Sequence, residues 1–181
     1  PSPESLEGHW PEGLKQARRL FAGVSPLAAA ARGGCQFEAG SFLVPLLHRR
    51  FTISYPSGEV RESGQEKPPP MWLHILLLHY LLTADGTPVA DSWIAYRHLP
   101  GTLFFEGRFN SMAIRPLLTR FGGDLAGFRR AALALCGDSM SRSGDAAFRF
   151  LALPCIPMAI ILYIGDEEMS PSLNLLFDAA S

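Results

Sequence analysis

Two histidines lie five residues apart in the most apolar stretch of the chain that can be helical, residues 71–82. On a helix with about 3.6 residues per turn, His74 and His79 point roughly 140° apart. They therefore do not form the i, i+4 pair that holds a metal ion on one helix face. One interpretation is a buried histidine that donates to a backbone carbonyl, and the other is His79 as an axial ligand to a haem or corrinoid metal.

A run of three carboxylates, Asp166-Glu167-Glu168, follows a strongly apolar segment near the end of the chain. Carboxylates gathered at a strand end can bind a divalent cation or act as acid and base. Asp178 and Asp145 are candidates to join them in space. The alternative is that the run is a solvated turn.

Trp93 and Arg97 lie on and just after a short β-like segment, where they could frame a pocket. A core tryptophan beside a surface arginine is the competing interpretation. The sequence has no Gly-x-Ser-x-Gly nucleophile motif, no phosphate loop and no Gly-x-Gly-x-x-Gly fingerprint. No enzyme class is therefore indicated by a motif.

Composition excludes several classes of protein. Sixteen basic and seventeen acidic residues give a net charge of −1, so no electrostatic footprint for nucleic acid is present. The three cysteines, Cys35, Cys136 and Cys155, form no CxxC pair, and this chain alone is not expected to hold zinc or an iron–sulfur cluster. No apolar run reaches the roughly 18–20 residues that span a bilayer, and the polar N-terminus lacks signal-peptide character. We expect a cytoplasmic protein that does not enter a membrane.

The pattern of apolar residues predicts an extended lead-in over residues 1–11 and a single domain over residues 12–181. Helical spacing and helix-start signals predict helices at about 12–22, 26–32, 71–83, 107–121, 125–136 and 171–178, with Pro116 kinking or breaking the fourth. Alternating or continuous apolar runs predict strands at 35–38, 41–48, 50–55, 59–61, 92–96, 145–153 and 158–164.

This order of elements indicates an α+β fold, in which a mostly antiparallel sheet packs against several helices. The helix at 71–83 is apolar on all sides, so we expect it to be buried. The strand at 158–164 is nearly all apolar and should lie in the centre of the sheet.

Several short motifs in a fixed order resemble a known family. They are His79-Tyr80-Leu81-Leu82, Ala84-Asp85-Gly86-Thr87-Pro88, Trp93-Ile94, Arg97, Leu99-Pro100-Gly101, Gly144-Asp145-Ala146, Leu153-Pro154, Gly165-Asp166-Glu167-Glu168, Pro171-Ser172 and Leu176-Phe177-Asp178. The family is a domain of unknown function from anaerobic bacteria and archaea. Its members are often fused to, or encoded near, an iron–sulfur domain like that of the corrinoid iron–sulfur protein. The resemblance covers about residues 12–181.

The resemblance implies a setting in anaerobic metabolism and an iron–sulfur or corrinoid protein as a candidate partner. It also favours His79 over His74, with Tyr80, Trp93 and Arg97 as further cofactor-binding candidates. Relatives continue with a histidine- and tyrosine-containing loop and an acidic helix, and we expect this chain to lack that segment. The cysteine count leads us to expect no cysteine-rich domain either.

Three hypotheses follow. The first is a non-enzymatic cofactor-binding or accessory module in corrinoid, one-carbon or redox metabolism, with a tetrapyrrole or a metal as the cofactor. The second is a metal-assisted hydrolase that uses Asp166, Glu167, Glu168 and Asp178, with His79 as a further candidate. The third is a structural protein-interaction domain.

Overall fold

The computed structural model describes residues 10–141 and 144–180. Contacts between residues divide the chain into two compact units, Pro1–Thr87 (unit 1) and Pro88–Ser181 (unit 2), each with its own sheet. The boundary falls at the end of the turn that follows the central helix, within the range that the sequence assigns to one domain. Most of the predicted lead-in lies outside the described residues, and the first helix begins at Trp10, two residues earlier than expected.

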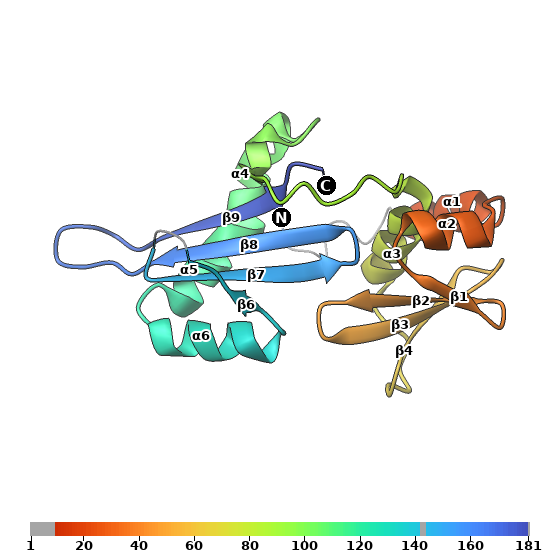
Figure 1. Ribbon diagram of the computed structural model, residues 1–181, viewed down its shortest axis with the longest axis horizontal. Coiled ribbons are helices and arrows are strands. Elements are labelled where there is room, and N and C mark those ends of the chain that lie inside the picture. Colours follow the sequence, from red (N-terminus) through yellow and green to blue (C-terminus); the bar gives the residue numbers. More distant parts are fainter. Residues whose placement is uncertain (1–9, 142–143, 181) are drawn as a thin grey trace. The chain divides into compact units, whose positions relative to one another are not determined.

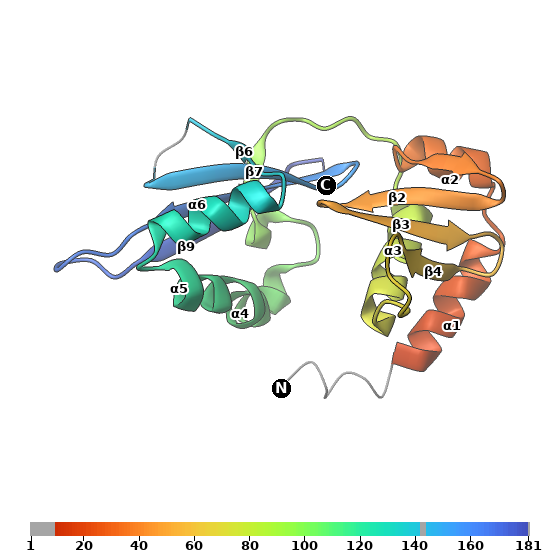
Figure 2. The ribbon, with the colours of Figure 1, turned by 90° about the horizontal axis from the view of Figure 1, so that it is seen from below.

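Unit 1 is a four-stranded antiparallel sheet, in the order β1-β2-β3-β4, with its helices on one face (Figures 1 and 2). Its elements are α1 (Trp10–Phe21), α2 (Pro26–Arg32), β1 (Gln36–Glu38), β2 (Ser41–Leu46), β3 (Arg49–Ser54), β4 (Glu59–Glu62) and α3 (Met71–Thr83).

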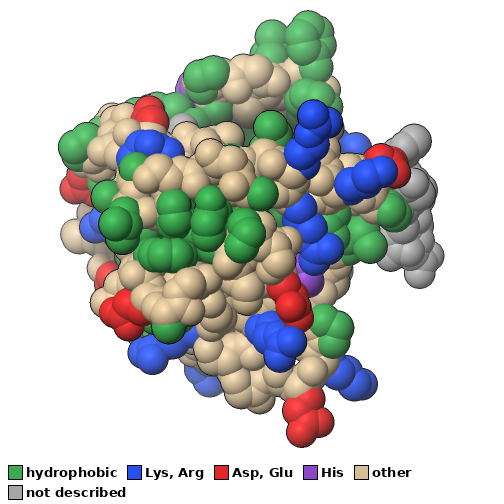
Figure 3. All heavy atoms as spheres, turned by 90° about the vertical axis from the view of Figure 1, so that its right-hand side faces the viewer, with side chains coloured by type: hydrophobic (Ala, Val, Ile, Leu, Met, Phe, Trp, Pro, Cys, Tyr) green, Lys and Arg blue, Asp and Glu red, His purple; other side chains and the backbone are tan. Residues whose placement is uncertain are grey.

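Alternation along the strands decides which face of this sheet is buried. Phe51, Ile53 and Val60 are at most 1% exposed, whereas Thr52 and Arg61 between them are not buried. One face is therefore apolar, and α1 and α3 cover it, as expected for a half-solvated antiparallel sheet. In Figure 3, hydrophobic side chains also form a band across the surface that unit 1 turns to the viewer.

The predicted central helix is confirmed as α3. Leu73, Leu77, Leu78 and Leu81 are completely buried, because they face the sheet and α1. No described element of unit 1 covers the opposite side of the helix, where Trp72 and its neighbours are exposed. α3 is thus buried on one side only, although its sequence is apolar all round.

Unit 2 has a five-stranded sheet in the order β5-β9-β8-β7-β6, and all neighbouring strands are antiparallel. Its strands are β5 (Trp93–Ala95), β6 (Asp138–Ser139), β7 (Ala146–Leu153), β8 (Ile156–Tyr163) and β9 (Ser172–Asp178). Its helical elements are η2 (Tyr96–His98), η3 (Leu103–Phe105), α4 (Glu106–Phe109), η4 (Asn110–Ile114), α5 (Arg115–Phe121) and α6 (Leu125–Ala134). The α+β class is confirmed, with two antiparallel sheets, and β8 is central in its sheet as predicted.

The predicted last helix is wrong: residues 172–178 form β9. Leu173 and Leu175 are buried while Ser172 and Asn174 are exposed, which is the period of a strand. Pairing with the apolar strand β8 outweighs the helix-start signal of Ser170-Pro171.

The helical stretch around Pro116 continues through a local change of winding. η4 is a π-helical segment, and the N–H of Arg115 bonds to the carbonyl of Asn110, five residues back. Pro116 has no N–H, and its ring crowds the carbonyl four residues earlier. An extra residue in the preceding turn relieves that crowding.

Candidate functional site

His74 is the buried polar side chain of unit 1, and it lies near the start of α3. It is 8% exposed, although most residues around it on the helix are apolar. Its Nε2 atom lies 3.1 Å from the carbonyl oxygen of Pro69, in the loop that leads into the helix. Because a carbonyl only accepts hydrogen bonds, Nε2 carries the proton in this arrangement. The ring thereby ties α3 to its own N-terminal loop.

The second ring nitrogen, Nδ1, is left without a hydrogen-bond partner among the described residues. In the neutral Nε2–H tautomer Nδ1 is an acceptor, and a buried acceptor without a donor costs about 1–3 kcal/mol. Burial is the main reason that the pKa of His74 lies below its usual value, and the nearby charge of Arg18 lowers it further. The hydrogen bond to Pro69 and the charge of Glu59 oppose that shift. His74 is thus a neutral ring with one unused acceptor.

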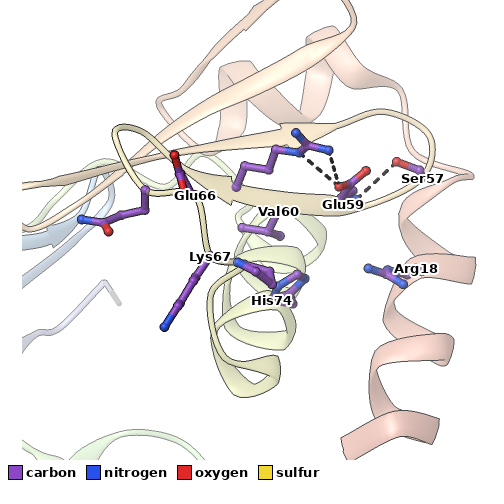
Figure 4. Close-up of a pocket in the computed structure, with 10 residues that line it drawn as sticks. Arg18, Ser57, Glu59, Val60, Glu66, Lys67 and His74 are labelled. Atoms are coloured by element: carbon purple, nitrogen blue, oxygen red, sulfur yellow. Dashed lines mark hydrogen bonds and ion pairs between the residues drawn. The ribbon is translucent and has the colours of Figure 1, made fainter.

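His74 lines a hollow of about 780 Å³ beside β4, which we call the His74 hollow. Figure 4 shows Arg18 reaching toward it from α1, with Lys67 on the other side of His74. The lining residues come from α1, the β3–β4 turn, β4, the following loop and α3: Arg18, Ser57, Glu59, Val60, Arg61, Gln65, Glu66, Lys67, Pro68 and His74.

The charges that line the hollow are only partly neutralised. Arg61 pairs with Glu59 at 2.9 Å. Arg18 is half-buried, and its Nε donates to the carbonyl of Gly58 at a long 3.4 Å, while no described acidic group lies within ion-pair distance of its guanidinium. Lys67 likewise has no partner in the described part of the chain. No pattern in the sequence predicts this site, because its residues are separated by up to 56 positions.

The site candidates on α3 fall on different sides of the helix. His79 is exposed, on the side that the sheet does not cover. Tyr80 is 5% exposed, and its hydroxyl donates to the carbonyl of Gly33 at 2.6 Å. The structure therefore does not bring His79 and Tyr80 to one ligand, since adjacent helix positions differ by about 100°.

Trp93 and Arg97 belong to unit 2. Trp93 lies on β5 opposite Asp178 and is partly exposed. Arg97 is exposed on η2, 4.0 Å from Glu106. Neither of them lines the hollow that Tyr96, Phe105 and Phe109 help to form in the same unit.

The acidic run forms an exposed turn. Asp166 accepts hydrogen bonds from the N–H groups of Glu168 and Met169, at 2.9 and 2.7 Å, which are the first causes of its lowered pKa. Within residues 10–141 and 144–180, no three His, Cys, Asp or Glu side chains are arranged to hold a metal ion. Cys35, Cys136 and Cys155 form no disulfide in the structure.

Asp178 lies at the opposite end of β9 from the acidic turn and is completely buried. The seven residues of β9, each of which adds about 3.3 Å of length, separate Asp178 from the acidic turn. Its Oδ1 accepts from the N–H groups of Ala90 and Ala180, both at 2.9 Å. Burial by itself would raise the pKa of Asp178, but backbone N–H donors from residues 90–92 and 180 outweigh it and lower the pKa. This carboxylate fastens the segment before β5 to the end of β9.

We expect Asp178→Asn to destabilise the protein by about 1–3 kcal/mol at pH 7, because the charge-assisted bonds to the backbone weaken. The pKa of Asp178 is lower in the folded state, so its stabilisation is present above about pH 4 and is lost as the pH falls through the folded-state value. In urea unfolding, the difference in the free energy of unfolding between the variant and the parent protein should be smaller at pH 3 than at pH 7. Asp138→Asn, at an exposed position, is the control. If Asp178→Asn lowers the free energy of unfolding no more than Asp138→Asn does, the stabilising role assigned to the Asp178 carboxylate is contradicted.

None of the helices within the described residues is long and apolar enough to cross a membrane. No curated protein and no solved structure matches the chain. A family model, described as a domain of unknown function (DUF3786), matches residues 25–181. This range covers unit 1 from α2 to α3, which includes His74. It also covers every described element of unit 2 and the acidic turn. The chain belongs to the DUF3786 family.

Proposed function

We propose that the chain is a non-enzymatic binding module and that the His74 hollow is its binding site. The observation that carries this proposal is the unpartnered Nδ1 atom of a histidine that is more than nine-tenths buried and lines the hollow. Natural proteins seldom leave a buried polar atom unsatisfied without a reason. A ligand group that donates to Nδ1 removes this cost.

The chemistry of the walls selects an anionic ligand. Arg18 and Lys67 lie on either side of His74, and neither forms an ion pair with a described acidic residue. Of the two acidic residues that line the hollow, Glu59 already pairs with Arg61. Arginine is suited to carboxylates and phosphates because its donors form a planar fork. The site thus favours a ligand with a negative group for Arg18 and a hydroxyl or N–H group for His74. The family resemblance supplies the setting, which is anaerobic corrinoid, one-carbon or redox metabolism.

Titration with succinate, which supplies the negative groups, tests the Arg18 part of the site. In the ¹⁵N-labelled full chain, succinate should shift the backbone amides of residues 57–61 and 65–68. Arg18→Gln should weaken binding about tenfold or more, because a charge-assisted hydrogen bond is worth about 1.5–3 kcal/mol. Arg19→Gln, one position along the same helix and exposed, should leave the affinity unchanged. Equal losses in the two variants, or no shifts at all, would contradict the proposal.

A second binding function is favoured by the exposed side of α3. Trp72, Leu76 and His79 follow one another at helical spacing, and Trp72 and Leu76 are 46% and 41% exposed. An imidazole on an apolar helix face suits axial ligation of a flat macrocycle, such as a haem or a corrinoid, or the docking of a protein that carries one. His79 would then be the ligand, as the resemblance implies.

Spectroscopy separates this function from the first. Haemin or aquocobalamin added to the full chain should give a shifted absorbance band, and His79→Ala should abolish it. His48→Ala, at an exposed histidine of the β2–β3 turn, should retain the band. A band that survives His79→Ala would remove His79 as the ligand.

A further inference from the structure

In unit 2, large apolar side chains are exposed at the start of the helical stretch that leads into α5. Leu103, Phe104 and Phe105 form η3, and they are 66%, 94% and 53% exposed. Met112, further along the same stretch, is 50% exposed. Single apolar residues on a surface need no explanation, but several that lie together mark a site of interaction. We call Leu103, Phe104 and Phe105 the apolar tip.

Aromatic packing holds the base of the apolar tip in place. The ring of Tyr96 in η2 stacks on the ring of Phe109 in α4, with 4.1 Å between the centroids and 3° between the planes. Each of these rings also lies 6.1 Å from that of Phe177 on β9. The hydroxyl of Thr102 lies 2.6 Å from the carbonyl oxygen of Tyr96, so it ties the turn before η3 to η2. The segment that carries the tip is therefore fixed to the sheet on both sides.

The three side chains of the apolar tip point in different directions. In a 3₁₀ helix, with three residues per turn, successive side chains are about 120° apart. The start of this helical stretch is therefore apolar on all sides rather than on one face. A protein surface of fixed shape would cover one of these side chains and leave the others in water. The fluid interface of a bilayer can surround all three, so the shape of the tip favours a lipid surface.

The charges around the apolar tip are mostly positive. Residues 96–121 contain four arginines and one acidic residue, Glu106, so four minus one gives +3, whereas the whole chain carries −1. Arg97 lies 4.0 Å from Glu106. Arg108 and Arg115 are exposed, and neither forms an ion pair with a described acidic residue. This balance favours a negatively charged partner.

The distance between the tip and its nearest free cation matches the structure of a bilayer surface. Arg108 follows Phe104 by four residues, which is about 6 Å along a helix at about 1.5 Å per residue. The headgroup layer on each side of a bilayer is about 5–8 Å thick. When Phe104 lies at the lower boundary of that layer, Arg108 is level with the lipid phosphates.

We infer that the apolar tip inserts shallowly into the surface of a bilayer that contains anionic lipids, with Arg108 and Arg115 on the lipid phosphates. Contact of this kind strengthens with the apolar area that enters the interface and with the attraction of cations to anionic lipids. It needs no helix that spans the membrane. The inference departs from the sequence-based expectation of no membrane partner, because only the fold decides which apolar side chains are exposed. It does not depend on the His74 hollow, which belongs to unit 1.

Sedimentation with lipid vesicles tests this inference on the full chain. Vesicles of phosphatidylcholine with about 30% phosphatidylserine should carry the protein down, and vesicles of phosphatidylcholine alone should carry much less. Raising the salt concentration to about 0.5 M should reduce binding to the anionic vesicles, because salt screens the attraction between the arginines and the headgroups.

Two pairs of variants separate the tip from the rest of the surface. Phe104→Ser should weaken binding about tenfold or more, because a phenylalanine side chain no longer leaves water. Leu133→Ser, at a 63% exposed position of α6, should bind like the parent protein. Arg108→Gln should weaken binding about fivefold, which is the contribution of one cation near an anionic surface. Arg130→Gln removes the same charge from an exposed position of α6 and should have little effect.

The contrary outcomes are equally specific. Absence of sedimentation with both kinds of vesicle, or equal losses for Phe104→Ser and Leu133→Ser, would overturn the inference. Binding that neither salt nor Arg108→Gln weakens would overturn the role of the anionic lipid. If no vesicle binds and Phe104→Ser converts a dimer into a monomer in sedimentation velocity, the tip is a contact between copies of this chain and the lipid inference fails.

Discussion

The hydrogen bond between His74 Nε2 and the carbonyl of Pro69 is the constraint on which the rest of the site depends. It joins the first turn of α3 to the loop that carries Lys67, and it fixes which ring nitrogen holds the proton. Because Nε2 is committed to the backbone, Nδ1 is left as a buried acceptor without a donor among the described residues. Removing this bond would free the loop and the ring together. The geometry of the site and the start of the helix are therefore set by one interaction.

The apolar packing of unit 1 supplies the rigidity that such a site needs. The leucines on one side of α3 are buried, as are Phe51, Ile53 and Val60 of the sheet, so the helix cannot rotate without exposing apolar side chains. That packing holds His74 beside β4, and the pairing of α1 with α3 brings Arg18 to the same place. Polar groups held by packed elements are better oriented than groups on loops alone. The hollow therefore has two fixed walls and one wall, around Lys67, formed by a loop.

Much of the fold could be predicted from local patterns. Apolar alternation marked β3, and the apolar run with its preceding prolines marked α3. The strand β9 could not be predicted, because Ser170-Pro171 resembles a helix start and only its pairing with β8 decides the outcome. The hollow could not be predicted either, since Arg18, Val60 and His74 meet only through tertiary packing. The sequence identified a buried histidine bound to a carbonyl as one interpretation, and His74 has that arrangement, whereas His79 is the exposed member of the pair.

The most direct measurement of the central claim is a pH titration of the His74 ring nitrogens by long-range ¹H–¹⁵N correlation, with and without saturating succinate. The account predicts the Nε2–H tautomer and a free-state pKa below the usual value of about 6.5, because burial disfavours the charged ring. A bound anion should raise the pKa of His74, since its negative charge stabilises the protonated ring. An Nδ1–H tautomer, or a pKa that succinate leaves unchanged, would contradict the assignment of the hollow as the binding site.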